Sequence, residues 1–143
     1  MEMVSIAMTG PAIALGLSAI GSAIGCSVAG QTSHAVMSRV EEGHGKFIGL
    51  SAAPSSQMIY GLVLMIMMQG RIQSGDLLPW DGVGIGLFCG LAIMMSAVFQ
   101  GRVAASGIEA SARSPSLYGK TWVAVGIVEA FALFAFVFAN MLM

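Results

Sequence analysis

The sequence has little charge. Only 9% of its 143 residues are charged, whereas 57% are hydrophobic. Soluble domains carry about 25% charged residues, and a chain with so few cannot cover its surface with polar groups in water. The sequence therefore excludes an ordinary soluble domain and predicts an integral membrane protein.

The sequence also has no excess of basic residues, few cysteines and no recognisable catalytic motif. The net charge of -1 leaves no basic surface for nucleic acid, so we expect no nucleic-acid partner. Cys26 and Cys89 lie in apolar segments without metal-ligand neighbours, and we interpret them as packing residues. The N-terminal Met-Glu-Met lacks the positive region of a signal peptide, which argues against lipidation at "AIGC". No nucleophile–base pair or phosphate-binding loop is evident, so we expect no enzyme.

Four apolar stretches are long enough to cross a bilayer, which takes about 20 helical residues. They span about residues 6–30, 47–68, 83–105 and 121–142, separated by the polar segments 34–46, 69–82 and 107–120. Because apolar and polar residues hardly alternate within them, we predict helices rather than barrel strands. The predicted fold is an all-α membrane protein with four transmembrane helices in two tandem helical hairpins, residues 1–72 and 73–143.

Basic residues are shared unevenly among the three polar segments. Those that flank the first and third segments are Arg39, Lys46, Arg102, Arg113 and Lys120, whereas the middle segment has only Arg71. Basic loops stay in the cytoplasm. We therefore expect segments 34–46 and 107–120 to be cytoplasmic and both termini to lie outside the cytoplasm.

A shift of 74 residues aligns the second hairpin with the first. The aligned pairs include Gly10 with Gly84, Ser22 with Ser96, Arg39 with Arg113 and Lys46 with Lys120. A constant offset over both hairpins indicates a tandem duplication, in which both repeats cross the membrane in the same direction. The shift pairs Glu129 with Ser55, so only the second hairpin has an acid at that level.

Small residues line the first and third predicted helices at helical spacing. Gly21 and Gly25 lie in the first, and Gly82, Gly86 and Gly90 in the third. Small residues on one face let membrane helices approach closely. Two interpretations stay open: packing within one hairpin, or a crowded inner ring built from many copies.

Glu129 is the one ionisable residue deep inside a predicted span, in "VEAFALFAF" (128–136). A charged side chain at the bilayer centre costs about 2.5–3.5 kcal/mol even on lenient scales. Such a cost calls for a proton, a cation or hydrogen-bond partners. The residue therefore predicts an ion carrier, with a neutral structural acid as the alternative.

Further oxygen-bearing groups occur in "APSSQMIYG" of the second span, where Ser56, Gln57 and Tyr60 can share one helix face. Pro54 has no N–H and so frees a carbonyl one turn earlier. Gln100 lies near the cytoplasmic end of the third span. Such an all-oxygen set suits a hard cation, although Ser56 and Gln57 are also explained as hydrogen bonds between helices.

Three segments carry a resemblance to a known family. "APSSQMIYG", "FQGRVAASGI" and "GIVEAFAL" resemble the proteolipid subunit of rotary V/A-type ATPases, in its duplicated four-helix, sodium-translocating form. The resemblance covers nearly the whole chain. It implies a homo-oligomeric rotor ring, a stator subunit whose arginine faces the carboxylates, and central-stalk subunits at the cytoplasmic loops. ATP hydrolysis would turn the ring, or ion flow would drive it backwards.

The resemblance also implies a transported cation and its ligands. Those it implies for Na⁺ are one backbone carbonyl and four side chains, from Ala53, Ser56, Gln57, Gln100 and Glu129. Ser56 stands where the sodium form has threonine, so the hydroxyl is kept. Tyr60 would donate a hydrogen bond to Glu129 and close the site.

Two alternatives remain open. The same rotor subunit would carry protons if the extra oxygens serve packing alone. A stand-alone small transporter or channel bundle would line a continuous path with polar residues, whereas here they gather at one level of the membrane.

Overall fold

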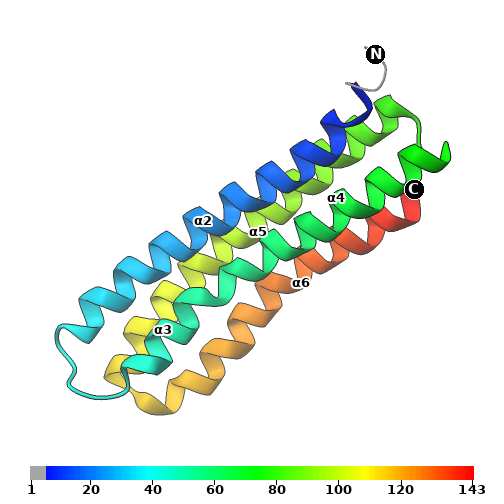
Figure 1. The fold of residues 1–143 in the computed structure, drawn as a ribbon. Coiled ribbons are helices and arrows are strands. Elements are labelled where there is room, and N and C mark those ends of the chain that lie inside the picture. The colour runs from blue at the N-terminus through cyan, green and yellow to red at the C-terminus, as the bar shows by residue number, and fades with distance from the viewer. Residues whose placement is uncertain (1–5) are drawn as a thin grey trace.

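The computed structural model describes residues 6–143, which form a bundle of long helices (Figure 1). Helix α2 is Thr9–Met37; α3, His44–Ala52, leads through the 3₁₀ turn η1, Ala53–Ser55, into α4, Ser56–Ser74. Helix α5 is Pro79–Arg113, and η2, Pro115–Leu117, leads into α6, Tyr118–Leu142. No strand occurs among the described residues. The predicted all-α class is confirmed.

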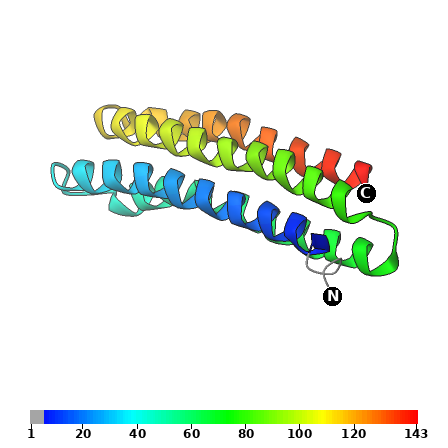
Figure 2. The same ribbon diagram turned by 90° about the horizontal axis from the view of Figure 1, so that it is seen from above.

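Within residues 6–143, four helical segments are long and apolar enough to cross a membrane: Thr9–Met37, His44–Ser74, Pro79–Arg113 and Pro115–Leu142. They form two hairpins that run in the same direction and lie one against the other (Figure 2). The connection 75–78 lies at the end of the bundle where α2 begins and α6 ends, and the connection 38–43 lies at the opposite end (Figure 1). The four-helix, two-hairpin architecture is as predicted; the repeat boundary at residues 72 and 73 stays a prediction.

The helices extend beyond the apolar spans, and in this respect the predicted polar segments were too long. They reduce to the connections 38–43, 75–78 and Ser114. Helix α5 has 35 residues and is therefore about 52 Å long, whereas the hydrocarbon core is about 30 Å thick. Alanine, serine, glutamate and arginine continue the helix outside the bilayer because they are tolerated in helices in water.

The closest helix contact joins the two hairpins, along α2 and α5. A Cβ on Gly21 would meet the backbone of Met94, and one on Gly25 would meet the backbone of Ala97. A Cβ on Gly101 would in turn meet Gly25. Within the chain, the glycines on this face thus bring the two hairpins together, and Gly25 also lies against Pro54 of its own hairpin. Gly61 of α4, which lies against Ser18 of α2, serves packing within the first hairpin.

Large apolar side chains lie mainly on the outside. Exposed examples on α4 and α6 are Ile59, Ile66, Val123, Phe131 and Phe138. The buried positions of α2 are instead almost all glycine, alanine, serine or proline. Large residues outside and small residues inside are the arrangement of helices that pack in lipid.

Candidate ion-binding site

The break between α3 and α4 shapes one wall of the site. Pro54 is buried and cannot donate to the carbonyl of Leu50, so the chain tightens into the 3₁₀ turn η1. The carbonyl of Leu50 instead accepts the N–H of Ala53, so the carbonyl that we expected to be free is not free. The turn places Ser56, Gln57 and Tyr60 in the first turns of α4.

Two donors converge on the carboxylate of Glu129. The Tyr60 hydroxyl of α4 donates to Oε1 at 2.6 Å, and Gln100 Nε2 of α5 donates to Oε2 at 3.3 Å. Hydrogen bonds to an ionised carboxylate are stronger than those between neutral groups. The ring of Phe136 lies 6.4 Å from that of Tyr60, centre to centre, and packs beside it on α6. Three helices thus meet at one acid.

The two glutamines connect this acid to the start of α4. Gln57 Nε2 donates to Gln100 Oε1 at 2.8 Å, and the Ser56 hydroxyl donates to Gln57 Oε1 at 3.2 Å. The carbonyl of Ala53 lies 3.2 Å from the same hydroxyl and also accepts from it. The structure therefore brings all six predicted site residues into one continuous hydrogen-bonded chain.

Both glutamine side chains are completely buried. Buried amides without partners cost about 1–3 kcal/mol each, and here every amide nitrogen and oxygen has one. Glu129 itself is only half-buried in the single chain. Its carboxylate has no cationic partner, since the ion pair found among the described residues joins Arg71 to Asp76 near the connection 75–78.

Two serines, which the sequence did not assign to the site, connect α4 and α6 to their neighbouring helices. Ser96 of α5 donates to the carbonyl of Val128 at 2.8 Å, directly before Glu129. Ser22 of α2 accepts the N–H of Met58 at 2.9 Å, directly after Gln57. These serines are 74 residues apart and were paired by the repeat. The repeat was therefore the signal that could have identified them.

The counterpart of the site in the other repeat has lost its polar groups. The 74-residue shift places Phe131 where Gln57 lies, Phe134 where Tyr60 lies and Cys26 where Gln100 lies. Ser55 takes the place of the acid. The chain thus builds one polar site, between the hairpins, from two repeats.

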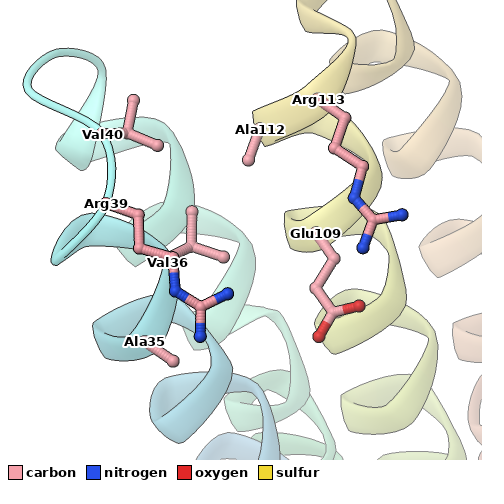
Figure 3. Close-up of a pocket in the computed structure, with 7 residues that line it drawn as sticks. All are labelled: Ala35, Val36, Arg39, Val40, Glu109, Ala112 and Arg113. Carbon is pink, nitrogen blue, oxygen red and sulfur yellow. The ribbon is translucent and has the colours of Figure 1, made fainter.

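A charged hollow lies at the end of the bundle that carries the connection 38–43. It has a volume of about 310 Å³ and is lined by Arg39 beyond the end of α2 and by Glu109 and Arg113 of α5 (Figure 3). The two arginines are related by the repeat. This hollow is separate from the residues around Glu129 and shares none of them.

Comparison with known proteins places the chain in a family. The model of the family described as the C subunit of ATP synthase matches residues 9–68 and again residues 83–142. The two matches begin 74 residues apart, at the offset that the sequence indicated. Both hairpins therefore carry one copy of the family's unit.

Two curated relatives are similar over most of the chain. A-type ATP synthase subunit K of Methanocaldococcus jannaschii is 30% identical over 134 residues, which cover 94% of this chain and 60% of the relative. V-type sodium ATPase subunit K of Enterococcus hirae is 30% identical over 128 residues, covering 87% of this chain and 81% of the relative. The resemblance drawn from the sequence is thereby confirmed: the chain is an integral membrane protein that belongs to the family of ATP synthase C subunits and carries the family's unit twice.

Proposed function

We propose that this chain is the rotor-ring subunit of a V/A-type ATPase and carries sodium ions across the membrane on Glu129. The observation that carries the proposal is the set of oxygen-bearing groups around this one membrane-embedded acid, with Tyr60 and Gln100 both bonded to it. Membership in the family supports assembly as a ring within an ATPase complex. The chain itself hydrolyses no ATP in this proposal.

The free-energy cost of a charged Glu129 in lipid would couple rotation of the ring to ion transport. A bare carboxylate is expensive in hydrocarbon, so Glu129 faces lipid only when a cation or proton compensates it. It releases its ion where a stator subunit supplies an aqueous channel and an arginine. Turning the ring therefore moves ions one way, driven by ATP hydrolysis in a peripheral part of the complex or, in reverse, driving ATP synthesis.

Sodium binding requires a rearrangement of the glutamine chain. Gln100 turns its nitrogen, not its oxygen, to Glu129, and Gln57 turns its nitrogen to Gln100. Hard cations take oxygen ligands. We infer that a bound sodium ion rotates both amides by half a turn, so that their oxygens join the carboxylate, the Ser56 hydroxyl and the Ala53 carbonyl around it.

Protons are the alternative cargo. A proton needs the acid and one acceptor, whereas this site buries two complete amides beside the acid. The surplus of oxygens supports sodium. A stand-alone channel is less well supported. The two buried amides lead to Glu129, whereas the other buried polar side chains are serine and threonine hydroxyls, of which Ser18 and Thr121 bond to carbonyls one turn earlier in the chain.

We propose that the central-stalk subunits dock at the charged hollow lined by Arg39, Glu109 and Arg113. Both repeats present mixed charges at this end of the bundle. We propose that this end faces the cytoplasm, in line with the distribution of basic residues.

The test of the proposal is Glu129→Gln, measured as ATP-driven sodium uptake into vesicles that contain the whole complex. Glutamine keeps the shape and accepts the Tyr60 hydrogen bond, but it cannot alternate between charged and compensated states. We expect an assembled ring with no coupled uptake. Asp81→Asn, an exposed acid in the first turn of α5 at the opposite end of the bundle from the charged hollow, is the control and should transport normally. Uptake at the unmodified rate in Glu129→Gln would contradict the proposal.

A further inference from the structure

Helix α5 is the repeat counterpart of α2, and the face of α2 that contacts α5 corresponds to a face of α5 that points away from α2. The 74-residue shift carries the contact residues Gly10, Ala14, Leu17, Gly21 and Gly25 of α2 onto Gly84, Phe88, Leu91, Met95 and Phe99 of α5, which we name the leading face. Phe88 is 71% exposed and Phe99 45%. Nothing within the described chain covers this face.

The outward face of α2 is its complement. The same shift, taken backwards, carries the residues of α5 that touch α2 onto Ala12, Gly16, Ile20, Ala23 and Ser27, which we name the trailing face. All five are exposed. A Cβ on Gly16 would meet nothing within 4 Å. Helices that simply face lipid carry large apolar residues, as α4 and α6 do, whereas this face is mostly small.

Both hairpins run in the same direction, so the step that carries the first hairpin onto the second can be taken again. Within the chain, a Cβ on Gly90 would lie 3.2 Å from Cα of Ala14, and a Cβ on Gly101 would meet Gly25. In the next step, α5 takes the position of α2, and α2 of a following copy takes the position of α5. The two pairs then become Phe88 against Gly16 and Phe99 against Ser27 of the following copy. The large residues of the leading face thus meet the small residues of the trailing face.

Charge at the end that carries the connection 38–43 agrees with this register. A groove of about 430 Å³ between α5 and α6 contains Arg102 and Lys120 and no acid. In the first repeat, Lys46 lines a smaller pocket together with Pro115 and Tyr118 of the second repeat, and its amine lies over the Tyr118 ring. The shift replaces these two neighbours of the lysine by Glu41 and His44 of the following copy. Glu41 is exposed and has no ion pair among residues 6–143.

We propose that a second copy of this chain docks its trailing face on the leading face in this register, with Phe88 on Gly16, Phe99 on Ala23 and Ser27, and Lys120 beside Glu41. This inference rests on the proposed ring and names its contact surface. Phe88 takes the place of Ala14 and Phe99 that of Gly25. Contacts between α2 and α5 around the ring therefore alternate between a tight one within each chain and a wider one between chains.

The test uses cysteine pairs in membranes that contain the whole complex, with Cys26 and Cys89 replaced by alanine. One chain carries Phe88→Cys with Gly16→Cys, and another carries Phe99→Cys with Ser27→Cys. The swapped pairs, Phe88→Cys with Ser27→Cys and Phe99→Cys with Gly16→Cys, are offset by 11 residues, about 16 Å along the helices. They serve as matched controls for a bifunctional thiol reagent shorter than that offset.

The expected result is a ladder of multimers from the two matched pairs and monomers from the swapped pairs. Equal ladders from all four, or ladders from the swapped pairs alone, would overturn the register. Monomers from every pair would also overturn it, with phospholipid then covering the leading face. In each of these cases sodium uptake that depends on Glu129 would leave the proposed function standing.

A charge exchange provides a measurement that does not alter the helix faces. Lys120→Glu should lower the fraction of ring that survives in detergent, and adding Glu41→Lys to the same chain should restore it. A double variant less stable than the single one would contradict the contact between Lys120 and Glu41.

Discussion

At the scale of single residues, the site depends on donors directed at one acid. The Tyr60 hydroxyl, the Gln100 amide and the Gln57 amide are each bonded to the next group in line. Residue types and helical spacing predicted these members, because an acid in lipid needs partners. The direction of each amide was not predictable, since it is set by contacts between α4, α5 and α6 that spacing along one helix does not contain.

The Tyr60 hydroxyl should hold the loaded site closed. Tyr60→Phe removes one charge-assisted hydrogen bond of about 1.5–3 kcal/mol, so we expect apparent sodium affinity to fall about 10- to 100-fold while the ring stays assembled. The sodium dependence of ATP hydrolysis by the whole complex measures this. Tyr118→Phe, at the end of the bundle that carries the connection 38–43, is the control. Unchanged affinity in Tyr60→Phe would show that the hydroxyl does not act on the bound ion.

The two glutamines should matter more for the ion than for the fold. Gln100→Leu and Gln57→Leu each remove an oxygen from the proposed sodium ligands but keep the side-chain volume. We expect sodium affinity to fall more than ring stability, and further for Gln100, which contacts Glu129 directly. Sodium titrations beside detergent stability give both quantities, with Gln73→Leu, exposed on α4, as control. If the stability of the ring in detergent fell as much as its sodium affinity, the glutamines would serve packing alone.

At the scale of helices, the close contact of α2 with α5 fixes the distance between the hairpins. The sequence predicted close approach from its glycines but not which helix would be approached, because that depends on how two hairpins dock. Likewise Ser22 and Ser96 appeared only as repeat partners. In the structure, Ser22 bonds α2 to α4 and Ser96 bonds α5 to α6, in each case at a residue next to a member of the site.

Filling this contact should separate the hairpins. In Gly25→Val the new side chain meets the Ala97 backbone and Pro54, and overpacking of this kind costs about 1–3 kcal/mol or more. We expect a marked loss of folded protein, seen as reduced resistance to protease in membranes. Gly70→Val, where a Cβ meets nothing within 4 Å, should behave as the unmodified chain does. Comparable resistance in both variants would contradict the backbone contact.

At the scale of the whole molecule, the duplication was the most informative feature of the sequence. A single offset of 74 residues predicted two parallel hairpins, and the two family matches begin at that offset. The lengths of the helices were not predicted, because hydropathy marks where lipid ends and not where a helix ends. Because Ser55 stands where the counterpart of the site would have its acid, the chain has one acid deep in the apolar spans for four helices.

The orientation in the membrane has a direct test. With Cys26 and Cys89 replaced, Ser38→Cys and Ser114→Cys should react only with reagents that reach the cytoplasm, because the basic residues gather at that end. Ser74→Cys, exposed near the connection 75–78, should react from outside. Labelling of Ser38→Cys by an impermeant reagent added to intact cells would reverse the assignment.

Sodium binding by Glu129 can be measured through the reaction of this acid with a carboxyl-reactive carbodiimide. The reagent requires the protonated acid, whereas sodium requires the ionised acid, so the two compete. We expect millimolar sodium to protect Glu129 of the assembled complex at fixed pH, and less sodium to suffice as the pH rises until the acid is fully ionised. Labelling unchanged across the sodium series, together with ATP-driven transport that needs no sodium, would contradict sodium binding by Glu129 and identify protons as the cargo.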